Sequence, residues 1–307
     1  MKRFLFMKIR ISAGTVRGIL LTAAVLICMG CSSVKTWAQQ EQLSGKMEDV
    51  KTSEDIQEPG NAKGPEDAQA YSTKSAQEGW ICRNQKYLYY EGGRKVKGIK
   101  TINGKKYYFD SKGVQHTGWQ KYEDQYYFFK TANAGKGFMT VSDKINDITL
   151  ASDGKAKLTE ESRAKLEILA MANQIVEKAS KPAMTKQEKL RKSFDYLLEH
   201  YQYRGSPEFL HTRHWEQDYA RAMFWEKHGS CYAYGAAFAF LANAAGYKNC
   251  YAVSSGGHGW AEAGGKVYDP SWQLIDKNHS YFGVSFSLSG VEGRPNYRRA
   301  RRFVVKI

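Results

Sequence analysis

Apolar residues recur at helical spacing through the C-terminal half of the chain. Between residues 160 and 178 they occupy positions 166, 169, 170, 172 and 175, and between residues 185 and 201 they occupy positions 190, 194, 197 and 198. Residues at such spacing share one face of a helix, so each stretch predicts a helix that buries one face. Thr185 with Glu188 forms a capping-box pattern at the start of the second helix. The aromatic segment 211–228 predicts a third helix.

A run of small and apolar residues from 233 to 245 predicts a fourth helix, buried on all sides. Ser230 is a suitable N-cap for this helix, and Gly246 is a suitable residue after its end. Cys231 therefore lies in the first turn. There the free backbone N–H groups and the positive end of the helix dipole favour a thiolate, and the same N–H groups could hold an oxyanion.

Strand patterns follow this helix. Residues 249–254 predict one strand, and residues 258–263 and 266–269 predict a hairpin closed by Gly264 and Gly265. This turn places Ala263 opposite Lys266, Trp260 opposite Asp269 and His258 opposite Ser271. His258 and Asp269 then become diagonal neighbours on one face, close enough for the carboxylate to orient the imidazole. Residues 281–287 and the stretch after Arg302 predict two further strands.

Residues 79–158 contain a repeat. Aromatic clusters led by Tyr87, Tyr107 and Tyr126 recur about every 20 residues, and residues 145–158 form a degenerate fourth unit. Each unit is too small to bury a core of its own, so the units are expected to stack as a β-hairpin solenoid. The helical pattern begins after this point, which predicts a domain boundary between residues 158 and 159.

The first 78 residues divide into two segments that are not expected to form a packed domain. A basic stretch and a short apolar core in residues 1–38 predict an export segment rather than a membrane span. Two processing sites compete: lipidation at Cys31, or cleavage after Ala38. Residues 39–78 are polar and rich in Glu, Gln, Ser and Gly, which predicts a disordered linker.

The formal net charge of +15 narrows the choice of partners. Six of the positive charges lie within residues 1–38. The remaining balance suits an anionic envelope polymer or an acidic protein substrate. The basic stretch 298–302 is either a solvated face or a groove for an acidic substrate. No nucleic-acid-binding motif is present, and no nucleic-acid partner is expected.

Cys231, His258 and Asp269 together form a candidate catalytic set of nucleophile, base and orienting carboxylate. Taken singly, each has an ordinary structural interpretation: a small core residue, a loop residue and a turn residue. Tyr201 or Tyr203 could line the same site. Cys82 and Cys250 lie in different predicted domains and are expected to stay reduced. A zinc site formed by His211, His214 and a cysteine lacks the usual motifs, so neither a metal nor a cofactor is expected.

The catalytic region resembles the transglutaminase-like superfamily. The resemblance rests on Gly229-Ser230-Cys231, His258-Gly259-Trp260 and Asp269-Pro270, in that order, and covers roughly residues 160–307. It implies an α+β, papain-like core of helices plus an antiparallel sheet, with Cys231, His258 and Asp269 as the triad for thiol-dependent acyl chemistry. Only 27 positions separate His258 from Cys231 (258 − 231), which leaves little room for the elaborations of animal crosslinking enzymes.

The repeats resemble the cell wall-binding repeats of Gram-positive surface proteins, which are related to choline- and glucan-binding repeats. The stretch from Asn103 to Asp110 carries the resemblance, and Gly118-Trp119 opens the next unit. Attachment to a teichoic acid or glucan-type wall polymer is implied. Gly98-Ile99 replaces the usual Gly-Trp pair, so a carbohydrate or an anionic polymer is as good a candidate as choline. The aromatic residues either bind this ligand or only stack the solenoid; the candidates are Trp80, Tyr89, Tyr107, Tyr108, Trp119 and Tyr127.

These observations predict an exported, cell-surface enzyme that performs acyl transfer or hydrolysis on protein or peptide amides through a thioester. Two alternatives remain open at this point. The same triad serves a cysteine protease or a hydrolase of peptidoglycan stem peptides. Otherwise the repeats do the work, and the cysteine domain is an inert adhesin or scaffold.

Overall fold

The computed structural model describes residues 77–131, 137–205, 208–298 and 302–307. The predicted export segment 1–38, with both processing sites, and nearly all of the predicted linker 39–78 lie outside these ranges. Within them, none of the helices combines the length and the apolar character needed to cross a bilayer.

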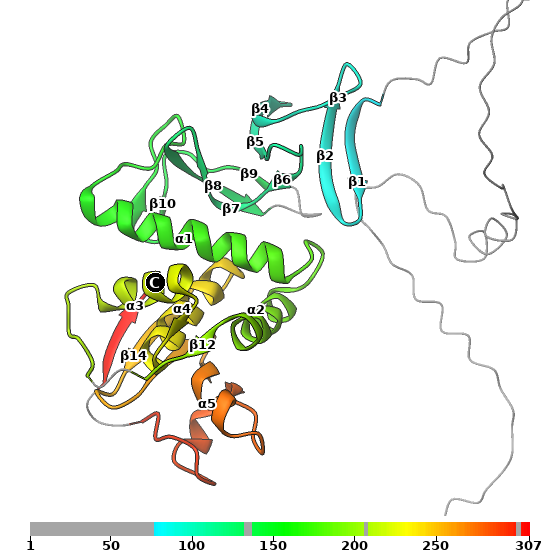
Figure 1. The fold of residues 1–307 in the computed structure, drawn as a ribbon. Coiled ribbons are helices and arrows are strands. Elements are labelled where there is room, and N and C mark those ends of the chain that lie inside the picture. Colours follow the sequence, from blue (N-terminus) through cyan, green and yellow to red (C-terminus); the bar gives the residue numbers. More distant parts are fainter. Residues whose placement is uncertain (1–76, 132–136, 206–207, 299–301) are drawn as a thin grey trace, which may run out of the picture.

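The repeats form separate small sheets along the chain, as Figure 1 shows in cyan and blue-green. Three consecutive units are three-stranded antiparallel sheets, and a fourth is a two-stranded hairpin. Both residues of the turns at Asn84-Gln85, Glu123-Asp124 and Asn146-Asp147 have positive φ, as tight two-residue hairpins require. The predicted solenoid of β-hairpins is confirmed. Its strands are β1 (Gly79–Arg83), β2 (Lys86–Glu91), β3 (Arg94–Lys95), β4 (Gly98–Ile102), β5 (Lys105–Phe109), β6 (Gln115–His116), β7 (Gly118–Tyr122), β8 (Gln125–Thr131), β9 (Gly137–Met139), β10 (Lys144–Ile145) and β11 (Ile148–Thr149).

Five helices follow the repeats: α1 (Glu160–Ala179), α2 (Lys186–His200), α3 (Trp215–Glu226), α4 (Cys231–Ala244) and α5 (Pro270–Ile275). The predicted capping box of Thr185 and Glu188 starts α2. The third helix is shorter than the predicted 211–228, because Lys227 takes a left-handed conformation that ends it. The fourth starts at Cys231, so the predicted place of the cysteine in the first turn is confirmed.

A five-stranded antiparallel sheet packs against α4, with strand order β17-β16-β15-β14-β18. Its strands are β14 (Cys250–Ser254), β15 (Gly259–Ala263), β16 (Lys266–Tyr268), β17 (Phe282–Val284) and β18 (Phe303–Lys306). A short parallel pair, β12 (Gln202–Tyr203) with β13 (His228–Gly229), lies just before α4 in the chain. The predicted strand 281–287 is shorter than expected, because a 3₁₀ turn over residues 286–288 follows β17.

The predicted hairpin is correct near its turn and wrong beyond it. Ala263 pairs with Lys266 and Ala261 with Tyr268, as predicted. The strand then ends at Tyr268, and Asp269 becomes the N-cap of α5, which contains Ser271. The predicted pairing of His258 with Ser271 is therefore wrong. Pro270 explains the change, because it has no N–H to donate to a ladder and suits the first position of a helix.

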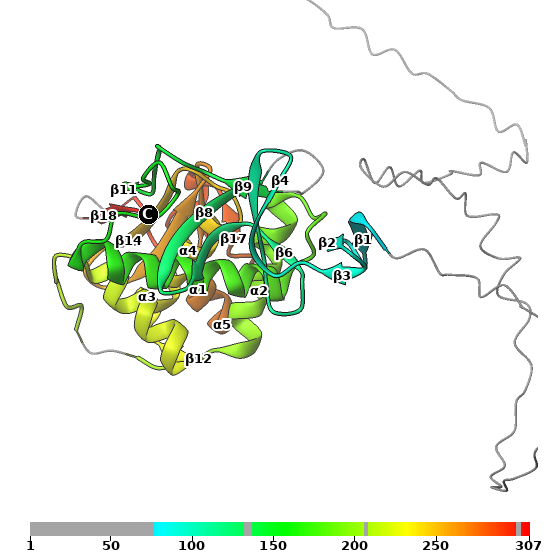
Figure 2. The ribbon, with the colours of Figure 1, turned by 90° about the horizontal axis from the view of Figure 1, so that it is seen from above.

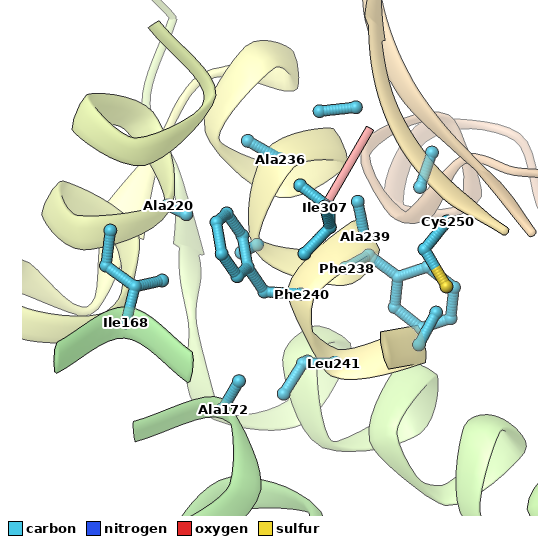
Figure 3. Close-up of a cluster of buried hydrophobic side chains, with 14 of the residues drawn as sticks. Ile168, Ala172, Ala220, Ala236, Phe238, Ala239, Phe240, Leu241, Cys250 and Ile307 are labelled. Atoms are coloured by element: carbon cyan, nitrogen blue, oxygen red, sulfur yellow. The ribbon is translucent and has the colours of Figure 1, made fainter. Parts of the chain in front are cut away.

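The core is built around α4. Twelve of its residues are buried, and Figure 3 shows its alanines and phenylalanines facing α1, α3 and the end of the chain. Small residues let the neighbouring backbones come close. A Cβ atom on Gly235 would lie 2.6 Å from the backbone nitrogen of Trp260, and one on Gly259 would lie 2.7 Å from the Cα of Tyr232. These contacts hold α4 directly against β15.

The last repeats share this core. Trp119, Tyr126 and Leu150 belong to the same cluster of buried side chains as α1 and α4. The side-chain amide of Asn173, on α1, donates to the carbonyl of Thr117 at 2.8 Å. Figure 1 shows α1 lying between the repeats and the remaining helices, and in Figure 2, seen from above, β8 crosses over α1. The predicted boundary at residues 158 and 159 falls just before α1, within a continuous apolar core.

Candidate active site

Cys231 is the first residue of α4, and its side chain is nearly buried, with 9% exposed. Ser230 occupies the N-cap position, but its hydroxyl makes no capping hydrogen bond. The Ser230 hydroxyl is also buried without a partner among the described residues. The serine side chain therefore leaves the N–H groups of the first turn to other acceptors. This arrangement suits a nucleophile whose substrate develops negative charge at the same place.

His258 ends a tight turn that begins at Ser255 and precedes β15. Its Nε2 lies 2.6 Å from Oδ2 of Asp269. The Cys231 side chain lies close enough to the imidazole to raise its pKa, and Nδ1 is the ring nitrogen that Asp269 leaves available. The hydroxyl of Tyr232, beside Cys231, donates to the carbonyl of Gly256 at 3.1 Å and ties this turn to α4. The structure thus brings the three predicted residues together.

Asp269 is fully buried, and its carboxylate has a hydrogen-bond donor on each side. Oδ1 accepts from the backbone N–H of Trp272 at 3.0 Å and from the Ser271 hydroxyl at 2.8 Å. Oδ2 accepts from the hydroxyl of Tyr297 at 3.1 Å and faces His258. A buried carboxylate needs such partners to remain charged and fixed in place.

The surroundings of His258 set its protonation state. Burial opposes the charged ring, but the Asp269 carboxylate and the Cys231 side chain both favour it, and together they raise the pKa of His258 to about 10. The imidazolium is therefore the stable form at neutral pH, facing the thiol on one side and a carboxylate on the other.

Tyr203 completes the immediate surroundings of the thiol. The parallel pairing of β12 with β13 sets Tyr203 opposite Gly229, two residues before Cys231. Cys231 lies close enough to this phenol to influence its protonation. Burial, followed by the nearby Cys231 and Asp269, raises the pKa of Tyr203, so the phenol keeps its proton. Of the two predicted candidates, Tyr203 therefore lines the site.

Tyr201 points elsewhere. Its hydroxyl accepts from the ammonium of Lys227 at 3.2 Å, and its side chain is buried in the core. Tyr201 is the residue that caps the end of α2, whereas Tyr203 lies in β12 beside β13. The sequence does not show which of the two tyrosines faces Cys231.

Tyr297 was not singled out by the sequence, and it supports the site from behind. It is fully buried, packs edge-to-face on Trp260, and donates to Asp269. The guanidinium of Arg302 donates to the Tyr297 carbonyl at 3.0 Å and to Glu262 Oε1 at 2.8 Å. This places one residue of the predicted basic tail in a structural contact. No local motif marks Tyr297, since it lies 28 positions after Asp269.

The predicted wall-ligand residues divide into two groups. Trp80 contacts Tyr89 and Tyr107 with ring centroids 5.3 and 5.0 Å apart, so these three form one aromatic cluster across the first two units. Trp119 and Tyr127 are buried, and Tyr108 packs on Phe129 at 5.8 Å. The second group therefore lies within packed cores, which favours a stacking role for its members.

Cys250 is the second buried cysteine among the described residues. The thiol of Cys250 is buried and donates to the carbonyl of Tyr247, and burial raises its pKa to about 12, so it is an inert core residue. In the described parts of the chain, no group of three or more histidine, cysteine or acidic side chains is arranged to hold a metal ion.

Comparison with known proteins gives two family matches. Residues 170–276 match the transglutaminase-like superfamily, and residues 96–136 match the choline-binding repeat. No curated protein matches this chain.

Among solved structures, the chain is similar to the choline-binding domain of Spr1274 from Streptococcus pneumoniae, at 22% identity and a TM-score of 0.25 over 27% of this chain and 99% of that one. It is also similar to choline binding protein F from Streptococcus pneumoniae, at 26% identity and a TM-score of 0.24 over 26% of this chain and 27% of that one. The modular Cpl-1 endolysin, solved with a peptidoglycan analogue, matches at 21% identity and a TM-score of 0.19 over 26% of this chain and 24% of that one. The chain thus spans about a quarter of the latter two proteins.

The family matches agree with the residues from which each resemblance was drawn. The predicted α+β fold, with hairpin repeats before a mixed helix and sheet core, is likewise present. The chain therefore carries a stretch that matches choline-binding repeats, followed by a stretch that matches the transglutaminase-like superfamily.

Proposed function

We propose that this protein is a cell wall-associated cysteine enzyme that performs acyl transfer or hydrolysis on protein or peptide amides. The observation that carries the proposal is the 2.6 Å contact between His258 and the buried Asp269, with the His258 ring facing a cysteine at a helix N-terminus. Cys231 is the nucleophile, His258 the base and acid, and Asp269 the residue that holds the ring.

The proposed reaction has two stages. The Cys231 thiolate adds to the amide carbonyl, and the resulting oxyanion accepts hydrogen bonds from the Cys231 N–H and the Tyr203 phenol. His258 then gives its proton to the leaving nitrogen, which departs as ammonia from a glutamine side chain or as an amine from a peptide bond. The thioester that remains is attacked by a second amine or by water, with His258 taking the proton of the attacking group.

Stem-peptide hydrolysis in peptidoglycan is the second candidate. It is supported by the core shared between the last repeats and α1, which joins the repeats to the catalytic helix without an intervening flexible segment. An enzyme built in this way acts close to the polymer that its repeats hold. Trp80, Tyr89 and Tyr107 are the proposed ligand contacts on the repeats, and the proposed location is the outer surface of the cell.

The test uses the chain from residue 39 with a glutamine-bearing protein, a fluorescent primary amine and, separately, purified peptidoglycan. Three forms are compared: the unmodified chain, Cys231→Ala and the matched variant Cys250→Ala. Amine incorporation that requires Cys231 but not Cys250 identifies crosslinking. Cys231-dependent protein fragments identify proteolysis, and Cys231-dependent muropeptides identify wall hydrolysis.

Retention of turnover in Cys231→Ala would refute the mechanism. The inert-scaffold alternative predicts in addition that iodoacetamide modifies Cys231 at the rate of an ordinary exposed thiol. Faster modification of Cys231, reduced when His258 is replaced, supports an activated nucleophile.

A further inference from the structure

A cavity of about 520 Å³ lies between the repeats and the helices. Residues of β6, β7 and β8 line it on one side, and residues of α1, α2 and the end of α4 line it on the other. Cys231 is at the opposite end of α4, which has 14 residues and is about 21 Å long at 1.5 Å per residue. The cavity is therefore separate from the candidate active site.

Lysine side chains dominate the charge of this cavity. Five of them line it, Lys86, Lys112, Lys130, Lys189 and Lys248, against two carboxylates. They come from the repeats as well as from α2 and the segment after α4, and they converge only in the folded chain. Among the described residues, Lys86, Lys112, Lys189 and Lys248 form no ion pair, while surface lysines such as Lys100 and Lys121 do. The cavity thus presents uncompensated positive charge.

Both carboxylates are already engaged. Glu177 Oε2 lies 2.8 Å from Nδ1 of His116, and Asp110 Oδ2 lies 3.1 Å from its Nε2. Burial opposes the charged ring, but the two carboxylates outweigh burial and raise the pKa of His116. With the ring protonated, the triplet keeps a net charge of about −1, so it offsets only one of the five lysines. Burial lowers the pKa of Lys189, and Glu177 only partly counters the effect, as expected for an ammonium short of negative charge.

The cavity also offers apolar surface to a ligand. Tyr87 and Phe128, from the repeats, line it together with Val176 and Pro182 from the helical side. Most of the surface inside the cavity is apolar. A ligand that fits both features carries anionic groups at intervals along a chain whose C–H groups form apolar faces. Carbohydrate and polyol backbones provide such apolar faces, and phosphodiesters provide the charge.

We propose that this cavity binds a phosphodiester-linked polyol chain of the cell wall, with the five lysines contacting phosphate and the aromatic side chains contacting the polyol. The source of the ligand follows from the proposed wall association, but the cavity does not depend on the catalytic proposal. Because the site is built from both the repeats and the helices, the bound polymer would be held by the two parts together, about one helix length from Cys231.

The test measures binding of a glycerol-phosphate oligomer to the chain from residue 39 by titration calorimetry. Lys189→Glu with Lys248→Glu reverses two charges at the cavity. Lys192→Glu with Lys266→Glu makes the same change in net charge at exposed lysines outside it. We expect the affinity of the cavity variant to fall by about tenfold or more. The affinity of the control variant should stay within about twofold of that of the unmodified chain. Higher salt should weaken the binding of the unmodified chain.

Equal losses in the two variants would overturn the proposal in favour of general attraction to a basic protein. Equal affinity for polyglutamate would do the same, because it would mean that charge alone is recognised. Binding of choline or a neutral glucan, with no binding of the glycerol-phosphate oligomer, would also overturn it. The alkylation rate of Cys231 is recorded in every variant, so a loss of binding with an unchanged rate is separated from any failure of the catalytic proposal.

Discussion

At the scale of single residues, the site depends on groups placed around one sulfur atom. Cys231 brings the backbone N–H of a helix N-terminus, His258 brings a proton, and Tyr203 brings a phenol close to Cys231. The sequence predicts the first two because their local motifs are distinctive. The sequence does not distinguish Tyr203 from Tyr201, because only the pairing of β12 with β13 decides which ring faces the thiol.

Tyr203→Phe tests the role of this phenol. Removing one donor to a transition-state oxyanion costs about 10²–10³-fold in kcat, and we expect a loss of about tenfold or more here because the backbone N–H remains. KM should change little, since the donor acts on the oxyanion rather than on the bound substrate. The measurement is steady-state kinetics on whichever amide substrate proves active. Tyr201→Phe is the matched control and should keep full activity; equal losses in the two variants would rule out a specific role for Tyr203.

The raised pKa of His258 makes a prediction about stability and pH. Its folded-state pKa of about 10 exceeds the value near 6.5 expected in the unfolded chain, so the folded state binds the proton more tightly. The resulting stabilisation is fully present below about pH 6.5 and is lost as the pH rises through about 10. Urea midpoints measured between pH 6 and pH 10 should therefore fall more steeply in the unmodified chain than in His258→Gln. The exposed His200→Gln serves as the control, and parallel profiles for all three proteins would contradict the assignment.

At the scale of elements, the close contact between α4 and β15 positions the cysteine against the histidine. The sequence predicts both elements and the start of α4 from the apolar run and the residues around Cys231. It does not predict how close they come, because Gly235 looks like any small helix residue until Trp260 is found against it. The predicted strand pairing of Asp269 is wrong for a local reason, because Pro270 ends the strand and begins α5.

Gly235→Ala tests this contact. A new Cβ would lie 2.6 Å from the backbone of Trp260, so the helix and the strand must move apart. Overpacking of this kind costs about 1–3 kcal/mol, which the urea midpoint would report. Activity should fall by more than the loss of folded protein explains, because the movement separates Cys231 from His258. Gly205→Ala is the matched control, since a Cβ there meets nothing within 4 Å. If Gly235→Ala were as stable and active as this control, the contact between α4 and β15 would tolerate a methyl group, which would contradict the prediction.

At the scale of the whole molecule, the last repeats and the helices that follow them share one packed core over the described residues. The sequence predicts the repeats from their spacing and the helices from their periodicity, and it places a boundary where one pattern replaces the other. Periodicity cannot show that the two patterns share a core. Trp119 looks like a repeat aromatic that could face a ligand, yet only 3% of it is exposed, and its indole N–H donates to Asn146 at 2.9 Å.

Trp119→Ala therefore tests whether the last repeats and the helices unfold together. Removing a buried tryptophan costs about 3–5 kcal/mol, and here the cavity would open beside α1 and reach the core of the catalytic helices. We expect a lower thermal midpoint for the whole described body, seen by calorimetry as one shifted transition, together with lower activity at elevated temperature. Trp80→Ala, in the first repeat and outside that core, should leave this transition in place. If Trp119→Ala instead produced a separate early transition with the main one unchanged, the repeats would be unfolding alone, and their core would not stabilise the catalytic helices.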